Sequence, residues 1–99
     1  MSYQIKLNEV ADEEFLNSFV WYELKAKGLG ERFITSVKNK LLKIAEHPFR
    51  YPVKKDDFRE TPLTGFPYSI VYFIDEIKKN IVISSIYHSK RNPEKKFRK

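Results

Sequence analysis

The stretch FPYSIVYFIDEIKKNIVISSIYH, residues 66–88, decides the fold because its apolar residues recur with a period of two. Such alternation is typical of β-strands that have one face against a core. The segment EIKKN, residues 76–80, interrupts the alternation and predicts a turn, so the stretch forms a hairpin of two central strands. One face of the first strand carries Tyr68, Ile70, Tyr72 and Ile74, and the other face carries Ser69, Val71 and Phe73.

Two helices are predicted before this hairpin. Asn8 is the expected N-cap of the first, with acidic residues in the first turns, and a Lys27-Gly28 pair ends it. The second ends at His47-Pro48, because the residue before a proline is pushed out of helical geometry. The short link predicts an antiparallel helical hairpin. Apolar residues at helical spacing are Ala11, Phe15, Phe19 and Tyr22 in the first helix, with Leu16 and Val20 beside them, and Phe33, Val37, Leu41 and Ile44 in the second.

The remaining segments complete an α+β fold. An alternation at Tyr3, Ile5 and Leu7 predicts a short N-terminal strand. Residues 53–63, VKKDDFRETPL, are ambiguous, and Pro62 confines any strand there to an edge or an early end. The expected order is β-α-α-β-β-β, an N-terminal strand and an antiparallel helical hairpin packed on a mostly antiparallel sheet. We expect one domain over residues 1–99, with a basic tail from about 90 to 99.

Composition narrows the class of protein. The 99 residues include no cysteine, which removes disulfides and thiolate chemistry. The N-terminus does not resemble a signal peptide, and no apolar run is long enough to span a bilayer, so we expect a soluble cytoplasmic protein. The net charge of +6 lies entirely in the second half, where twelve Lys and Arg face six Asp and Glu. This asymmetry favours an acidic partner, either nucleic acid or an acidic protein segment, although a basic tail can also serve only solubility.

The candidate functional residues gather near the C-terminal end of the last strand. Arg59 and Arg91 are expected to line one concave sheet face, with Tyr68 or Tyr87 between them. Cations interleaved with aromatic rings suit single-stranded RNA, because the cations contact phosphates and the rings stack on bases. The candidate target-binding set is Lys54, Lys55, Arg59, Lys90 and Arg91.

Cutting RNA without a metal would also require a base, an acid and cations around the phosphate. Tyr87, His88, Arg59 and Arg91 could supply these catalytic roles. Structural alternatives remain open: His88 as a half-exposed polar residue, and Trp21 as either a partner contact or additional core. The two histidines are far apart and neither has the spacing of metal ligands, so we expect no metal site and no cofactor.

The chain resembles the RelE/ParE superfamily of toxins from type II toxin–antitoxin modules, which includes ParE-like plasmid stabilisation proteins. The resemblance rests on GLGERF at residues 28–33, IAEHPFRYP at 44–52, FRETPL at 58–63, FPYSIVYFID at 66–75 and IYHSKRNP at 86–93. It implies a helical hairpin on an antiparallel sheet. It also implies a growth inhibitor that is neutralised by a cognate acidic antitoxin.

The resemblance leaves two activities open. RelE-like members cut messenger RNA on the ribosome, and ParE-like members poison DNA gyrase. In the nuclease branch an arginine usually follows the tyrosine of the central strand, whereas this chain has Ser69, which favours the ParE-like side. The alternatives are a ribosome-dependent mRNA endonuclease with Arg59, His88 and Arg91 near the scissile phosphate, and a non-toxic basic binding domain. Neither the membrane nor a small-molecule cofactor is an expected partner.

Overall fold

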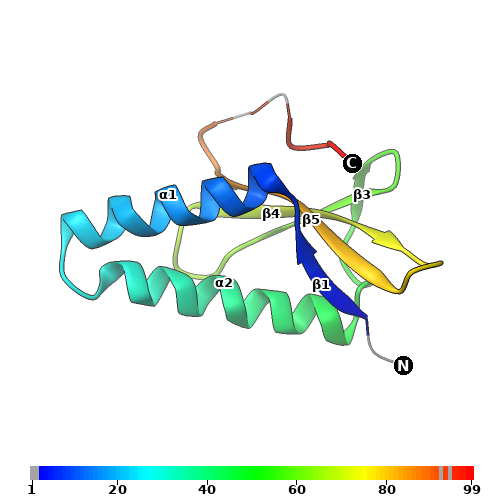
Figure 1. Cartoon of the computed structure of the whole chain (residues 1–99), viewed down its shortest axis with the longest axis horizontal. Coiled ribbons are helices and arrows are strands. Elements are labelled where there is room, and N and C mark those ends of the chain that lie inside the picture. The colour runs from blue at the N-terminus through cyan, green and yellow to red at the C-terminus, as the bar shows by residue number, and fades with distance from the viewer. Residues whose placement is uncertain (1–2, 92, 94) are drawn as a thin grey trace.

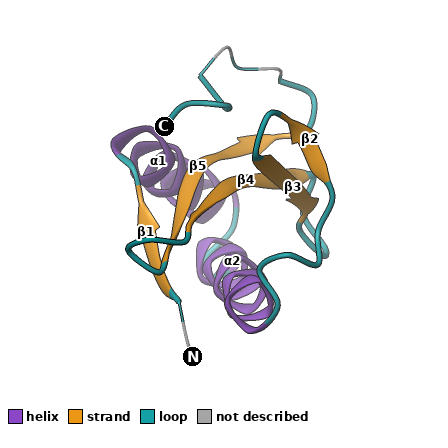
Figure 2. Ribbon diagram, turned by 90° about the vertical axis from the view of Figure 1, so that its right-hand side faces the viewer, coloured by secondary structure: helices purple, strands orange, loops and turns teal. Residues whose placement is uncertain are grey.

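The computed structural model describes residues 3–91, 93 and 95–99. Two helices lie side by side on one face of a five-stranded sheet (Figures 1 and 2). This arrangement confirms the predicted α+β architecture. None of the helices among the described residues combines the length and apolarity needed to cross a bilayer. The elements in chain order are β1 (Gln4–Leu7), α1 (Glu9–Lys25), α2 (Leu29–Glu46), β2 (Val53–Lys55), β3 (Phe58–Pro62), β4 (Tyr68–Asp75) and β5 (Asn80–His88).

The sheet has the strand order β1-β5-β4-β3-β2 and is antiparallel except for the β1–β5 pair. The predicted hairpin is β4 and β5, in register from Tyr68 opposite His88 to Asp75 opposite Asn80. The ambiguous segment 53–63 forms two short antiparallel strands, and Pro62 is the last residue of β3. Since β1 pairs only with Asn80–Ile83, the end of β5 that follows pairs with β4 on one side and has no strand on its other edge among the described residues.

Side chains fix the helix ends. The Asn8 side chain accepts a hydrogen bond from the amide of Ala11 (2.9 Å), as expected of an N-cap. The Glu23 carboxylate accepts from the amides of Gly28 (2.9 Å) and Gly30 (3.0 Å), so α1 caps the start of α2. The two helices approach each other closely at this contact. A Cβ on Gly30 would lie only 2.8 Å from the carbonyl oxygen of Phe19. Only glycine fits at this approach.

The core lies between the helices and the sheet. The helix-facing side of β4 is buried as predicted, with Ile70 and Tyr72 fully inaccessible to solvent. Phe33 and Val37 of α2 and Ala11 of α1 cover it. Tyr72 is satisfied inside this core, because its hydroxyl donates to the carbonyl oxygen of Pro48 (2.7 Å).

A β-bulge at Ser84 changes the direction of every later side chain in β5. Val71 pairs with Ser85 but Tyr72 pairs with Ile83, so Ser84 is one extra residue in the strand. Ile86 therefore joins the core under the helices, and Tyr87 joins a second cluster on the opposite side of the sheet. No local sequence pattern indicates this bulge, yet the bulge decides which predicted site residues can meet.

Candidate functional site

The structure separates the predicted site residues instead of gathering them on one concave face. Arg59 and His88 pair with Tyr72 and Tyr68, so both lie on the helix-facing side of the sheet. Tyr87 lies on the opposite side, which we call the open face. On β4, the partners of Arg59 and His88 are Tyr72 and Tyr68, which are four residues apart. Arg59 and His88 are therefore separated by about 13 Å along the strand direction.

Arg59 is used to hold the loop that follows α2. Its guanidinium Nη1 donates to the carbonyl oxygens of Phe49 (3.1 Å) and Tyr51 (2.6 Å). The hydroxyl of Tyr72 holds the same loop through Pro48. Arg59 therefore has a structural role here, and the structure does not bring it together with Arg91 as the sequence analysis expected.

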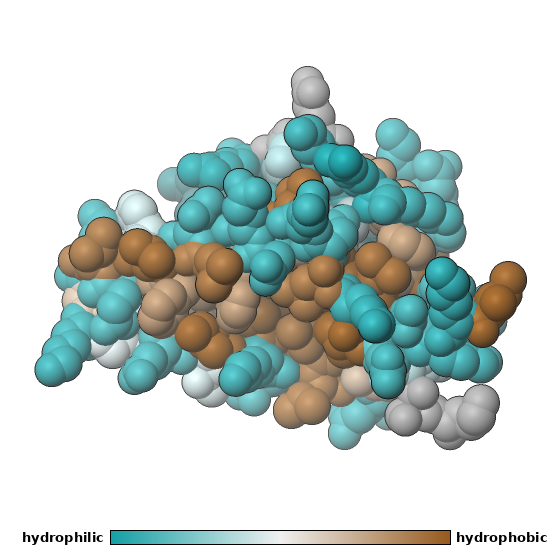
Figure 3. Space-filling model, viewed as in Figure 1, coloured by the Kyte–Doolittle hydropathy of each residue, from teal (hydrophilic) through white to brown (hydrophobic). Residues whose placement is uncertain are grey.

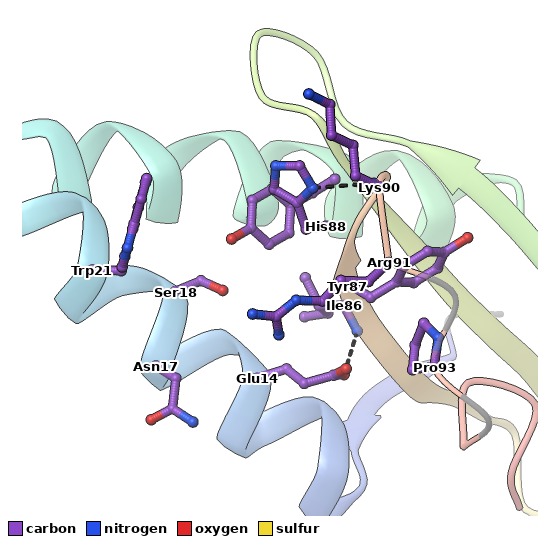
Figure 4. A pocket seen from close by; sticks show the side chains of 11 residues that line it. Glu14, Asn17, Ser18, Trp21, Ile86, Tyr87, His88, Lys90, Arg91 and Pro93 are labelled. Atoms are coloured by element: carbon purple, nitrogen blue, oxygen red, sulfur yellow. Dashed lines mark hydrogen bonds between the residues drawn. The ribbon is translucent and has the colours of Figure 1, made fainter.

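Arg91 instead lies in a cavity of about 560 Å³ between α1 and the free end of β5, which we call the α1–β5 groove. Figure 4 shows the Arg91 side chain reaching from the end of β5 toward α1. Tyr87 forms part of the groove wall, but its ring points away from the cavity (Figure 4). The polar and aromatic side chains that line the groove include Glu14, Ser18 and Trp21 from α1, and His88, Lys90 and Arg91 from the end of β5.

Glu14 closes the free edge of β5 inside this groove. Its carboxylate accepts from the amide of Ile86 (2.9 Å; Figure 4). It also accepts from the hydroxyl of Ser85 (2.8 Å). Burial raises the pKa of Glu14, although these hydrogen bonds and the charge of Arg91 partly oppose that effect. Glu14 was not predicted from the sequence, because its partners are more than seventy residues away in the chain.

His88 is held in place at the groove. Its Nδ1 accepts from the backbone amide of Lys90 (3.1 Å), and its ring meets that of Tyr68 edge-on at 5.3 Å. Lys90 and Arg91 are exposed beside it. The groove therefore has two cations at the end of β5 and the Glu14 carboxylate on α1. In the part of the chain that the structure describes, no three His, Asp or Glu side chains come together as a possible metal site.

Tyr87 is engaged on the open face. Its hydroxyl donates to Glu60, and the ammonium of Lys96 donates to the same hydroxyl (3.2 Å). Burial, followed by the hydrogen bond and charge of Glu60, raises the pKa of Tyr87 to about 12. The Tyr87 hydroxyl therefore keeps its proton near neutral pH, and that proton is used in the hydrogen bond to Glu60.

The C-terminal strap, residues 95–99, covers this part of the open face. The hydroxyl of Ser84 accepts from the amide of Arg98 (3.0 Å) and lies 2.6 Å from the carbonyl oxygen of Lys96. Phe97 packs on Phe58, and Lys99 pairs with Asp57 (2.7 Å). The segment expected as a basic tail therefore packs on the protein's own sheet. The tail did contain a signal, since Phe97 is an apolar residue among cations.

Lys54 and Lys55 lie on β2, and both are exposed. The ammonium of Lys55 lies 5.9 Å from the ring of Phe97, beside the strap. These lysines are therefore on the other side of the molecule from the α1–β5 groove, at the opposite edge of the sheet from β1. The predicted binding set therefore does not form one surface: Lys54 and Lys55 lie on β2, Lys90 and Arg91 line the groove, and Arg59 holds the loop after α2.

An apolar surface runs along the outer side of α1. Leu16, Val20 and Leu24 lie one helical turn apart and are 54%, 51% and 84% exposed, and Trp21 beside them is 53% exposed. We call these four residues the α1 ridge. Figure 3 shows apolar side chains gathered along this helix. Trp21 also lines the α1–β5 groove, so the ridge and the groove are continuous.

A family model and several solved structures are similar to this chain. The family model described as "ParE toxin of type II toxin-antitoxin system, parDE" matches residues 5–93. No curated protein sequence matches the chain. Solved structures with a similar fold include a chain of the chromosomal ParDE system from P. aeruginosa, with 13% identity, a TM-score of 0.76, and coverage of 89% of this chain and 97% of that one.

Two structures from E. coli are also similar. The isolated RelE toxin has 20% identity and a TM-score of 0.67, with coverage of 91% of this chain and 87% of that chain. A chain of the intact RelBE toxin–antitoxin complex has 21% identity and a TM-score of 0.68, with coverage of 90% and 99%. At these identities the likeness concerns the fold.

The strap makes a testable prediction. Replacing Ser84 by alanine removes the hydroxyl that joins the strap to β5, and we expect a loss of about 1–3 kcal/mol in the free energy of unfolding. Urea denaturation measures this loss, and hydrogen exchange at the Arg98 amide should become faster. Ser89→Ala, at an exposed position, is the control. Unchanged stability and unchanged exchange in Ser84→Ala would contradict the role given to the strap.

Proposed function

The chain belongs to the family of ParE toxins of type II toxin–antitoxin systems, and we propose that it inhibits growth by binding a macromolecular target, with DNA gyrase as the candidate. The proposed action requires no cofactor. Both gyrase and the ribosome, the alternative target, would place its action in the cytoplasm. A cognate acidic antitoxin would neutralise it.

The observation that carries this proposal is the separation of the four residues considered for RNA cleavage. A metal-independent nuclease needs its base, acid and cations around one phosphate. Arg59 is bonded to loop carbonyls, and Tyr87 is bonded to Glu60 under the strap on the other face. Tyr87, His88 and Arg91 all line the α1–β5 groove, but the ring of Tyr87 points away from it, so only the side chains of His88 and Arg91 face it among the four. A protein that acts by binding does not need such convergence.

Ser69 supports the same reading. It lies opposite Tyr87 on the open face and is almost fully buried. This is the position at which the resemblance to the nuclease branch would place an arginine. A serine hydroxyl cannot supply the fixed charge that offsets charge building up on a phosphate.

The ribosome-dependent mRNA endonuclease remains the second candidate because His88 and Arg91 face one groove. A histidine can transfer a proton and an arginine can bind a phosphate, so this pair could act on RNA if the ribosome supplied the missing groups. A non-toxic basic binding domain is the third candidate.

Induced expression in a bacterial host separates these candidates. We expect growth arrest with filamentation and a DNA-damage response, because poisoned gyrase leaves broken DNA. Messenger RNA should remain uncut at codon positions, and His88→Ala should remain toxic. Rapid translation arrest with codon-spaced cuts that are lost in His88→Ala or Arg91→Ala would establish the endonuclease instead. Absence of any growth defect would leave the non-toxic binding domain.

We further propose that the antitoxin covers the α1 ridge and the adjoining α1–β5 groove. A large apolar ridge is costly to expose, which suggests that a partner covers it. The groove beside it presents Lys90 and Arg91. Apolar residues next to cations suit an acidic amphipathic segment, whose apolar side would pack on the ridge and whose carboxylates would contact the cations.

This docking surface can be tested with the double variant Val20→Glu and Leu24→Glu. Both side chains are exposed, so we expect the fold to persist while affinity for the cognate antitoxin falls at least about tenfold, as for central interface residues. Isothermal titration calorimetry measures the affinity. Ile77→Glu, at a 95% exposed apolar residue in the β4–β5 turn, is the matched control. Wild-type affinity in the double variant would place the antitoxin elsewhere.

A further inference from the structure

The end of α2 and the start of β1 lie side by side at one end of the molecule (Figure 1). Residues from these segments and from the β4–β5 turn form a belt of aromatic rings and cations there. The Tyr3 ring meets the Phe49 ring edge-on at 6.5 Å, and the ammonium of Lys79 lies 5.4 Å from Tyr3. Lys40 and Arg50 lie 5.5 Å and 5.9 Å from the ring of Tyr51. We call this set the cation–aromatic belt: Tyr3, Phe49 and Tyr51 with Lys40, Arg50 and Lys79.

Two side chains of the sheet, Arg59 and Tyr72, hold the loop after α2 that carries Phe49 and Tyr51. The guanidinium of Arg59 donates to the carbonyl oxygens of Phe49 and Tyr51, the two belt residues on the loop after α2. Tyr72 donates to the carbonyl oxygen of Pro48 between α2 and these rings. The Phe49 ring is thereby held at the surface, with half of its area exposed to solvent. Arg59 acts as a positioning residue for this surface.

Two of the belt cations, Lys40 and Arg50, lie close enough to repel each other. Burial, followed by the charges of Lys43 and Arg50, lowers the pKa of Lys40. Within residues 3–91, 93 and 95–99, the ion pairs are Lys96 with Glu60 and Lys99 with Asp57, so no belt cation forms one. The Glu46 carboxylate lies beside Arg50 at the end of α2 but is not ion-paired with it. Like charges held close together without an ion-paired carboxylate favour the binding of an anion.

We propose that the cation–aromatic belt binds single-stranded nucleic acid, a function that goes beyond target poisoning and antitoxin binding. Lys40, Arg50 and Lys79 would contact successive phosphates, and the exposed ring of Phe49 would stack on an unpaired base. A duplex offers no free base faces to such a ring, and an acidic peptide would use the cations alone. The belt is separate from the α1–β5 groove, so its test does not depend on the toxin's target.

Fluorescence anisotropy with labelled 12-nucleotide oligothymidylate and oligouridylate tests the proposal on the full chain. Arg50→Gln should weaken binding and reduce the slope of log K against log salt by about 0.7, as for one lost phosphate contact with a single strand. Phe49→Leu keeps the apolar volume but removes the aromatic face. It should weaken binding about five- to fiftyfold and leave the salt slope unchanged.

Lys38→Gln is the charge-matched control, because Lys38 is exposed on α2 and lies outside the belt. It should leave affinity within about twofold of wild type, as expected when no phosphate contact is lost. The proposal is overturned if a duplex of the same length or polyglutamate binds as tightly as the single strand. It is equally overturned if Phe49→Leu binds like wild type, or if Lys38→Gln weakens binding as much as Arg50→Gln.

Discussion

The bulge at Ser84 determines how the rest of β5 is used. Without the extra residue, Tyr87 would continue the helix-facing row of Ile81 and Ile83, and His88 would point to the open face. With it, Ile86 enters the core, and Tyr87 meets Glu60 on the other side. The extra residue is itself the attachment point of the strap, through hydrogen bonds of its hydroxyl.

The molecule has three surfaces with different chemistry. The α1 ridge and the α1–β5 groove together offer apolar area beside cations, which suits a protein partner. On the open face, the Tyr87 phenol and the Glu60 carboxylate bond to each other and to Lys96 of the strap. The cation–aromatic belt lies at a third place, and Arg59 builds it from inside the sheet. A residue first considered for catalysis thus supports a binding surface.

Local patterns predicted most of the fold because they act over a few residues. The alternation from Tyr68 to Ile74 identified the core face of β4, and Asn8 and Pro48 marked helix ends through backbone chemistry that needs no tertiary contact. The candidate site was less predictable. Ser84 and Ser85 read as two ordinary strand residues, and nothing local indicates that one of them is a bulge.

Contacts between distant parts of the chain account for what the sequence did not reveal. Glu14 reaches β5 across more than seventy residues, and the strap returns to Ser84 from the C-terminus. Periodicity carries no information on such pairings. Charge counting identified a basic second half correctly but could not show that Lys96 and Lys99 are paired with the protein's own carboxylates.

Nuclear Overhauser effects measured by NMR in solution show whether the side chains of Tyr87 and His88 lie on opposite sides of the sheet. We expect contacts from the Tyr87 ring to Phe58 and from the His88 ring to Tyr68, with none between the Tyr87 ring and Trp21. Contacts that place the Tyr87 ring beside Tyr68 and α1 would contradict this placement of the two side chains.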